Sequence, residues 1–177
     1  DIVATGVHPA YAPLAIRLAR GWNVHLFPFD WRIDIEESAR RLDEYIRDRI
    51  LDGRNARPVH LVAHSMGGLV ARYYVDVLGG HEITRKVITL GTPHRGALNA
   101  LVSLVNGISK GVGPLKIDLS NLARSLPALY QLLPEYACIE SPAGLRKTTE
   151  HALPDVDTAM VADAMRFHDE LRDGATA

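Results

Sequence analysis

The chain has 177 residues, of which 47% are hydrophobic and 23% are charged, and its formal net charge at pH 7 is -1. These values place it among globular proteins, exclude disordered, collagen-like and coiled-coil classes, and give no net basic charge that would hold nucleic acid or an anionic membrane. The single cysteine, Cys138, excludes an intramolecular disulfide and a cysteine-rich zinc site, and the longest charge-free stretch, residues 2–16, is shorter than the roughly 20 apolar residues of a transmembrane segment.

Up to about residue 96, short β-rich runs alternate with amphipathic stretches. The expected order is a helix over Tyr11–Arg20, a strand over Asn23–Phe29, a helix over Ile35–Ile50, a strand over Pro58–His64, a helix over Leu69–Leu78 and a strand over Lys86–Leu90. The second of these helices has apolar residues at every third or fourth position and charged residues around the rest of its surface. The alternation predicts an α/β fold with a parallel sheet of about three strands.

From Ala97 onward the β-rich signal disappears, and helical stretches are interrupted by glycine and proline. The stretch Leu119–Leu133 is too rich in leucine for a free surface helix, so it must cover something. Packing on the main domain and a lid over an apolar substrate are both open and are compatible. A final helix is predicted over Asp155–Arg172. We therefore divide the chain into residues 1–96, the central part of a core, and residues 97–177, a helical cap or lid region.

The most informative segment is Val59–Tyr74, V-H-L-V-A-H-S-M-G-G-L-V-A-R-Y-Y. An apolar strand leads directly into Ser65, two glycines and a helix, which is the pattern of a nucleophile elbow. Such a turn strains the backbone of the serine and requires small residues two positions before and after it. Ala63 and Gly67 meet this requirement, with alanine in place of the usual glycine. The turn would also aim the Met66 amide at the space above Ser65, where it would bind a developing oxyanion.

A literal search for G-x-S-x-G finds a different serine, Ser109, within residues 107–111. The residues after Ser109 include two glycines and a proline, which do not open a helix as an elbow requires. Ser65, in contrast, has a β-branched strand before it and a good helix after it. We therefore predict that Ser65 is the elbow serine, and the alternative is a serine that ends a strand or caps a helix.

Four segments together resemble a known family. They are A-H-S-M-G-G-L-V-A-R at residues 63–72, V-I-T-L-G-T-P-H-R-G at 87–96, F-D-W-R at 29–32 and L-P-A-L-Y-Q-L-L-P at 126–134. Over roughly residues 9–171 the chain resembles an α/β-hydrolase of the lecithin:cholesterol acyltransferase-like group. The resemblance implies a lipid or other small-molecule ester as substrate. Ser65 would attack the ester carbonyl, and water or a lipid alcohol would then take the acyl group from the acyl-serine.

This chemistry also needs a histidine that takes the serine proton and a carboxylate that orients the histidine, in the chain order serine, acid, histidine. The in-order candidates are Asp155, Asp157 and Asp163 with His168. Asp157 and His168 lie on one predicted helix, with no further strands to carry them to separate loops, so the acid and the histidine are expected outside the chain. His94 follows a strand but precedes any acid loop, and it is expected to have a structural role in the G-T-P-H-R-G turn.

No metal or cofactor site is expected. His81 and Glu82 lack the second histidine of H-E-x-x-H, and no other cluster has the spacing of metal ligands. Neither standard glycine-rich phosphate loop occurs. The segment Asp30–Arg32 follows the first predicted strand and is expected to form a structural turn, with a head-group contact as the alternative.

The chain is interpreted as an internal piece of a larger domain, because the fold's usual third strand and oxyanion loop would come before Asp1. No signal peptide or true start is visible, so the compartment is left open, and the chain alone is expected to be inactive. Unless residues 1–7 replace the missing strand, a gap or distorted pairing is expected between residues 23–29 and 58–64. The alternatives in function are a thioesterase or general lipase, and a non-catalytic module that binds a partner or apolar ligand through its cap.

Overall fold

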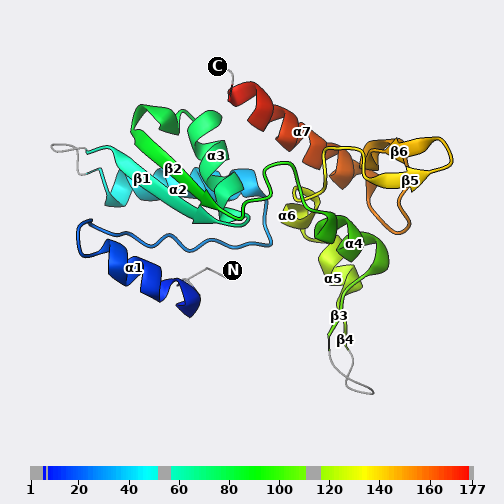
Figure 1. The fold of residues 1–177 in the computed structure, drawn as a ribbon, viewed down its shortest axis with the longest axis horizontal. Helices are drawn as coiled ribbons and strands as arrows, with labels where there is room; N and C mark the ends of the chain where they lie inside the picture. The colour runs from blue at the N-terminus through cyan, green and yellow to red at the C-terminus, as the bar shows by residue number, and fades with distance from the viewer. Residues whose placement is uncertain (1–5, 7, 52–56, 111–116, 176–177) are drawn as a thin grey trace. The chain divides into compact units, whose positions relative to one another are not determined.

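The structure is a computed structural model that describes residues 6, 8–51, 57–110 and 117–175 (Figure 1). The chain forms two compact units, one up to Asp30 and one from Trp31 onward. The combination of helices with a parallel strand pair confirms the α/β class. The boundary expected between residues 96 and 97 stays a prediction.

The first unit contains a short 3-10 turn, η1, Pro9–Tyr11, which leads into helix α1, Ala12–Leu18. His8 caps the turn, since its Nδ1 accepts a hydrogen bond from the Ala10 N–H at 3.2 Å. The predicted helix is confirmed but is shorter than expected at its carboxyl end, where the backbone turns back and the Trp22 N–H donates to the Leu18 carbonyl.

The strand predicted over Asn23–Phe29 is wrong, because these residues form no strand in the part of the chain that the structure describes. The prediction used β-prone residues, but a strand also needs a neighbour that pairs with its N–H and C=O groups. In the described ranges, β1, Val59–His64, pairs with β2, Thr84–Leu90, and with no other strand. The parallel sheet thus has two strands there instead of about three. Residues 1–5 and 7, named above as a replacement strand, lie outside the described residues.

β1 and β2 are parallel, with Leu61 opposite Val87 and His64 opposite Leu90. Parallel neighbours need a crossover connection, and here it consists of helix α3, Gly67–Asp76, and the 3-10 turn η2, Gly80–Glu82. α3 packs against both strands. Because α3 begins just after β1 ends, the turn between them lies at the carboxyl edge of the sheet.

Helix α2, Ile35–Arg49, packs on α3 and confirms the predicted amphipathic helix. Its buried apolar residues are Ile35, Ala39, Leu42 and Ile46. On its exposed side, Glu37 pairs with Arg41 and Asp43 with Arg47 at the i, i+4 spacing of neighbours on a helix surface. Such exposed pairs add little stability, so the apolar face holds α2 in place.

The part of the chain after Ala97 contains helices and short antiparallel ladders. The helices are α4, Leu98–Asn106, α5, Ser120–Arg124, α6, Pro127–Tyr130, the 3-10 turn η4, Thr148–Glu150, and α7, Thr158–Gly174. The ladders are β3, Ser109–Lys110, with β4, Ile117–Asp118, and β5, Ile139–Ser141, with β6, Gly144–Arg146. The expectation that no strand follows Leu90 is therefore wrong, because strands of two or three residues are too short to show a period-two pattern.

The leucine-rich stretch forms part of a second core. Pro127 starts a new helix within this stretch, which therefore divides into α5 and α6. The residues buried together are Leu101, Leu104, Tyr130, Leu133, Val156, Val161 and Ala164. All of these residues come from the part of the chain after Ala97, so Leu133 packs within that part, and the expected packing on the main domain stays a prediction, whereas Leu122 is 54% exposed.

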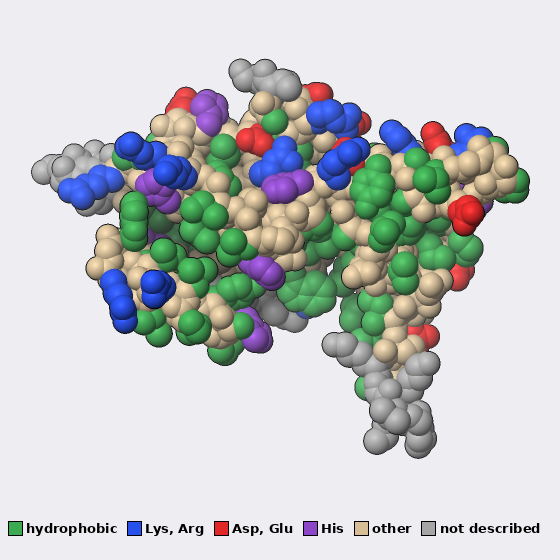
Figure 2. All heavy atoms as spheres, in the orientation of Figure 1, with side chains coloured by type: hydrophobic (Ala, Val, Ile, Leu, Met, Phe, Trp, Pro, Cys, Tyr) green, Lys and Arg blue, Asp and Glu red, His purple; other side chains and the backbone are tan. Residues whose placement is uncertain are grey.

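Helix α7 confirms the final predicted helix and starts slightly later than Asp155. Asp157 caps it, and its carboxylate accepts hydrogen bonds from the Ala159 N–H at 2.8 Å and the Met160 N–H at 3.3 Å. Basic and acidic side chains are interspersed along its exposed surface, as Figure 2 shows. Within the described ranges, no helix combines the length and the apolar character that crossing a bilayer requires.

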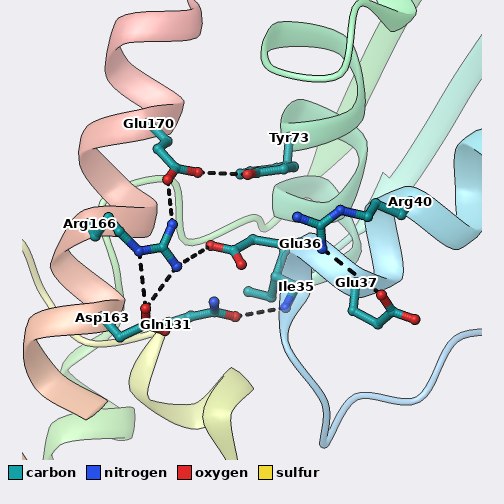
Figure 3. A network of polar contacts seen from close by, with 9 residues as sticks. All are labelled: Ile35, Glu36, Glu37, Arg40, Tyr73, Gln131, Asp163, Arg166 and Glu170. Atoms are coloured by element: carbon teal, nitrogen blue, oxygen red, sulfur yellow. Dashed lines mark hydrogen bonds and ion pairs between the residues drawn. The ribbon is translucent and has the colours of Figure 1, made fainter. Parts of the chain in front are cut away.

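One buried hydrogen bond joins α2 to the loop after α6 (Figure 3). Gln131 is 1% exposed, and its Oε1 accepts a hydrogen bond from the Ile35 N–H at 2.7 Å. The first N–H groups of a helix have no partner inside the helix, and Asp34 provides no side-chain cap. Gln131 therefore supplies the acceptor that this buried helix start needs.

We predict that Gln131→Ala lowers the free energy of unfolding by about 1–3 kcal/mol, because the buried Ile35 N–H loses its acceptor. Equilibrium urea unfolding measures this change. The control is Asn121→Ala, which removes a similar amide from the exposed surface of α5 and should change the stability by less than about 0.5 kcal/mol. Equal losses in the two variants would contradict the role of Gln131.

Candidate active site

Ser65 occupies the turn between β1 and α3 and has a strained backbone. Its φ is 53°, in the left-handed region that non-glycine residues rarely adopt. The turn is held on both sides, since the Ser65 N–H donates to the Leu90 carbonyl at 2.9 Å and the Gly68 N–H donates to the Ser65 carbonyl at 3.0 Å. Such a conformation costs on the order of 1–3 kcal/mol and persists only where the surrounding structure imposes it.

Met66 is the N-cap residue of α3. Its carbonyl accepts hydrogen bonds from the Leu69 and Val70 N–H groups at 2.9 and 3.2 Å. Its own N–H donates to no backbone carbonyl of the described residues. An N–H group at the start of a helix favours negative charge nearby. The turn thus places a hydroxyl and a helix-terminal N–H on adjacent residues.

Gly68 is a site residue that the sequence analysis missed. A Cβ at this position would lie 1.9 Å from the Oγ1 and 2.7 Å from the Cβ of Thr92, which follows β2. The elbow pattern requires small residues only two positions from Ser65, at Ala63 and Gly67. The close approach of α3 to the loop after β2 depends instead on Gly68. The second glycine of the Gly67–Gly68 pair was the available signal.

His94 has the structural surroundings that were expected for the G-T-P-H-R-G turn. Its Nε2 lies 3.1 Å from the Thr89 Oγ1, and it forms an isolated bridge with Gly96. Burial, and to a lesser extent the positive charge of Arg72, lowers the pKa of His94. The neutral form of the imidazole is therefore favoured at pH 7. Its contact with Thr89 ties the loop after β2 to that strand.

The loop after β2 and the 126–134 segment, two of the resemblance motifs, lie side by side. The Ala97 N–H donates to the Leu132 carbonyl at 2.8 Å, and Arg95 pairs with Glu135 at 2.6 Å. Gly96 has a φ of 82°, and a Cβ there would lie 2.2 Å from the Leu133 carbonyl oxygen. Segments about 40 residues apart in sequence thus pack together just after β2.

The structure gives the three in-order aspartates other roles. Asp155 has a φ of 55° and pairs with Arg124 at 3.4 Å, Asp157 caps α7, and Asp163 pairs with Arg166 at 2.7 Å. Within the described ranges, no hydrogen bond or ion pair joins any of them to Ser65.

His168, the in-order histidine, is 3% exposed on α7, and its ring meets the Phe167 ring edge-on at 5.4 Å. Its Nε2 is buried and has no hydrogen-bond partner among the described residues. Burial lowers the pKa of His168 more than the nearby Glu135 carboxylate raises it. His168 is therefore a neutral core residue in this structure, and the assignment of the acid and base to other segments stays a prediction.

Three further expectations concern positions away from the elbow. Ser109 lies on the two-residue strand β3 and is not followed by a helix in the described part of the chain, while residues 111–116 lie outside it.

Trp31 in the F-D-W-R segment is 59% exposed. Within the same described ranges, no group of three or more His, Cys, Asp or Glu side chains is arranged to hold a metal ion.

A model of the lecithin:cholesterol acyltransferase family matches residues 16–170, which include the elbow and both loop motifs. Among curated proteins, an uncharacterized protein of Saccharomyces cerevisiae, YJR098C, is 32% identical over 71 residues, which make up 40% of this chain and 10% of that protein. Triacylglycerol lipases of Pseudarthrobacter phenanthrenivorans and Burkholderia plantarii are each 41% identical over 49 residues, which make up 28% of this chain and 15% and 13% of those lipases.

A solved structure shows the likeness in fold. A chain in the crystal structure of the Tle4–Tli4 complex matches with a TM-score of 0.63 and 18% sequence identity. The match covers 82% of this chain and 41% of that chain. This chain therefore spans less than half the length of that neighbour, and its fold is of the α/β-hydrolase type.

We predict that Gly68→Ala destabilises the protein by about 1–3 kcal/mol, because a methyl group at this position overlaps Thr92 and forces α3 away from the loop after β2. Thermal or urea unfolding measures the loss. Adding Thr92→Gly removes the overlapping atoms and should recover part of the lost stability. A double variant no more stable than Gly68→Ala alone would show that the overlap is not the cause.

The buried histidine of α7, His168, predicts a pH dependence of stability. The pKa of His168 is below its ordinary value of 6.5 in the folded state, so the unfolded chain binds more protons below about pH 6.5. The stability that comes from keeping His168 neutral is therefore fully present above about pH 6.5. It is lost as the pH falls, by at most about 1.4 kcal/mol per pH unit for one group. Urea unfolding between pH 7.5 and 5 should show a smaller loss for His168→Leu than for the wild type. An unchanged pH profile would contradict this role.

Proposed function

The chain belongs to the lecithin:cholesterol acyltransferase family, of α/β-hydrolase type, and from that premise we propose that the protein is a serine-dependent esterase or O-acyltransferase acting on lipid-like esters. Ser65 is the proposed nucleophile and forms the acyl-enzyme. The family match and the lipase relatives support a lipid ester as the substrate class. The chemistry needs no cofactor, because the nucleophile and the oxyanion donors are protein groups.

The observation that carries the proposal is the left-handed backbone of Ser65 between a parallel strand and a helix. A serine that only caps a helix has an extended backbone and its side chain bonds to the helix start, whereas Ser65 has a φ of 53° and precedes the N-cap residue, Met66. The proposed role accounts for the strain, because a left-handed turn holds Oγ clear of the sheet edge for attack on a substrate.

The proposed reaction has two steps. A base takes the proton of Ser65 Oγ as the oxygen attacks the ester carbonyl, and the Met66 N–H donates to the oxyanion of the tetrahedral intermediate. The ester C–O bond then breaks, the base returns the proton to the leaving alcohol, and the acyl group stays on Ser65. In the second step the base takes a proton from water or a lipid alcohol as its oxygen attacks the acyl-serine, the bond between the acyl carbon and Ser65 Oγ breaks, and the base returns the proton to Oγ, which releases the acid or the new ester. We place the base and its carboxylate partner outside the described residues.

A fluorophosphonate probe tests this proposal on the full-length protein. The wild type should be labelled, and Ser65→Ala should abolish the labelling, because phosphonylation needs an activated serine oxygen. Ser109→Ala is the matched control, since it removes the serine of the literal G-x-S-x-G match and should be labelled like the wild type. Labelling that persists in Ser65→Ala would reject Ser65 as the nucleophile, and no labelling of the wild type would favour a non-catalytic module.

A second measurement tests the preferred acyl chain length and the acceptor of the acyl group. We expect p-nitrophenyl esters of increasing chain length to show higher kcat/KM up to a medium or long acyl chain, because the proposed substrate is lipid-like. Adding an acceptor alcohol should give an ester product if the protein is a transferase and only free acid if it is a hydrolase. A preference for acetyl esters, or for thioesters over oxygen esters, would reject the lipid ester as substrate.

A further inference from the structure

Helix α7 holds the elbow helix α3 at several points along its carboxyl half. The Tyr73 hydroxyl donates to Glu170 Oε2 at 2.6 Å, and an Arg72 N–H donates to the Leu171 carbonyl at 3.2 Å (Figure 3 shows the first contact). The rings of Tyr73 and Phe167 stack at 5.6 Å between centroids with 14° between their planes. We call the contact of Tyr73 with Glu170 and Phe167 the α3–α7 clamp.

The polar part of the clamp is held in place by its surroundings. Burial, and in second place the hydrogen bond to Glu170, raises the pKa of Tyr73, so its hydroxyl stays protonated and donates. Arg166 pairs with Glu170 from the same helix and with Glu36 of α2 at 2.9 Å. Glu36 is 8% exposed, so α2, α3 and α7 share one partly buried network, which Figure 3 shows.

At the other end of α3, Gly68 lies so close to Thr92 that a Cβ at this position would overlap the Thr92 side chain. Gly68 therefore sets how closely the start of α3 approaches the loop after β2, while the clamp holds the carboxyl half of the helix. Tyr73 lies five residues, or about 7.5 Å, beyond Gly68 on the same helix, so a tilt of α3 at Tyr73 would also displace the start of the helix and the turn before it, by less than the displacement at Tyr73. Misplacement of reacting groups by about 1 Å can cost as much as a hundredfold in rate.

We propose that Tyr73 and Glu170 are positioning residues, which set the place of the Ser65 hydroxyl and the Met66 N–H by fixing the axis of α3. This inference rests on the proposed function of Ser65. Neither Tyr73 nor Glu170 touches the reacting atoms. Because α7 comes from the part of the chain after Ala97, the clamp makes the reactivity of the elbow depend on the docking of that helix.

The test is the rate of phosphonylation by a fluorophosphonate in the full-length protein, resolved into kinact and KI. Tyr73→Phe keeps the ring stack and removes only the hydroxyl, so the protein should fold. We expect kinact to fall roughly three- to tenfold with KI unchanged, because misplacement affects the bond-forming step. Glu170→Ala should lower kinact at least as much, because it also removes the ion pair with Arg166, and the double variant should be no slower than Glu170→Ala, since both single variants remove the Tyr73–Glu170 hydrogen bond.

The matched control is Tyr130→Phe. Tyr130 is a buried tyrosine whose hydroxyl donates to the Arg124 carbonyl at 3.1 Å and accepts from the Asp157 N–H at 3.3 Å, away from α3. Its loss should lower the melting temperature about as much as Tyr73→Phe does, but it should leave kinact at the wild-type value. If Tyr130→Phe slows phosphonylation as much as Tyr73→Phe does, the effect of the clamp is only a loss of stability, and the inference is overturned.

The two proposals fail in different ways. If Ser65→Ala still reacts or the wild type does not react, the proposed function fails, and the positioning role fails with it. If Ser65 reacts but Tyr73→Phe has the kinact of the wild type, or additive effects appear in the double variant, only the positioning role is rejected.

Discussion

The close approach of α3 to the strand pair is the constraint on which the other features depend. β1 and β2 are parallel, so the chain must cross over between them, and it turns into α3 immediately after β1. That turn is compatible with the packing only because Gly68 has no side chain to meet Thr92, and because Ser65 accepts a left-handed backbone. The strain at Ser65 is offset by the buried helix face behind it, which includes Tyr73 and Tyr74.

The segments around the turn at Ser65 support it from two directions. The loop after β2 is fixed by its contacts with the 126–134 segment, including the pair of Arg95 with Glu135. The carboxyl half of α3 is fixed by α7, and the start of α2 is fixed by Gln131. The part of the chain after Ala97 therefore contributes to the surroundings of the elbow in addition to any role as a lid.

Periodicity and motif were sufficient for the local features. The apolar stripe from Ile35 to Ile46 predicted α2, and the strand, serine and glycines predicted the turn at Ser65. Features that depend on a partner far away in sequence were not predictable. Residues 23–29 have strand-forming side chains but form no strand, the ladders at β3 to β6 are too short for a pattern, and the contacts of Gln131 with Ile35 and of Gly68 with Thr92 join residues 96 and 24 positions apart. The aspartates near the final helix serve as cap and ion-pair partners, which the chain order of a triad does not reveal.

The most direct test of the account is the site of covalent modification by an alkyl p-nitrophenyl phosphonate in the full-length protein. This reagent transfers its phosphonyl group to an activated serine oxygen and releases p-nitrophenolate, and the adduct is stable enough for peptide mapping by tandem mass spectrometry. The account predicts one phosphonyl group per molecule, on Ser65. Stoichiometric modification of another residue, or no modification while the protein hydrolyses lipid-like esters, would contradict it.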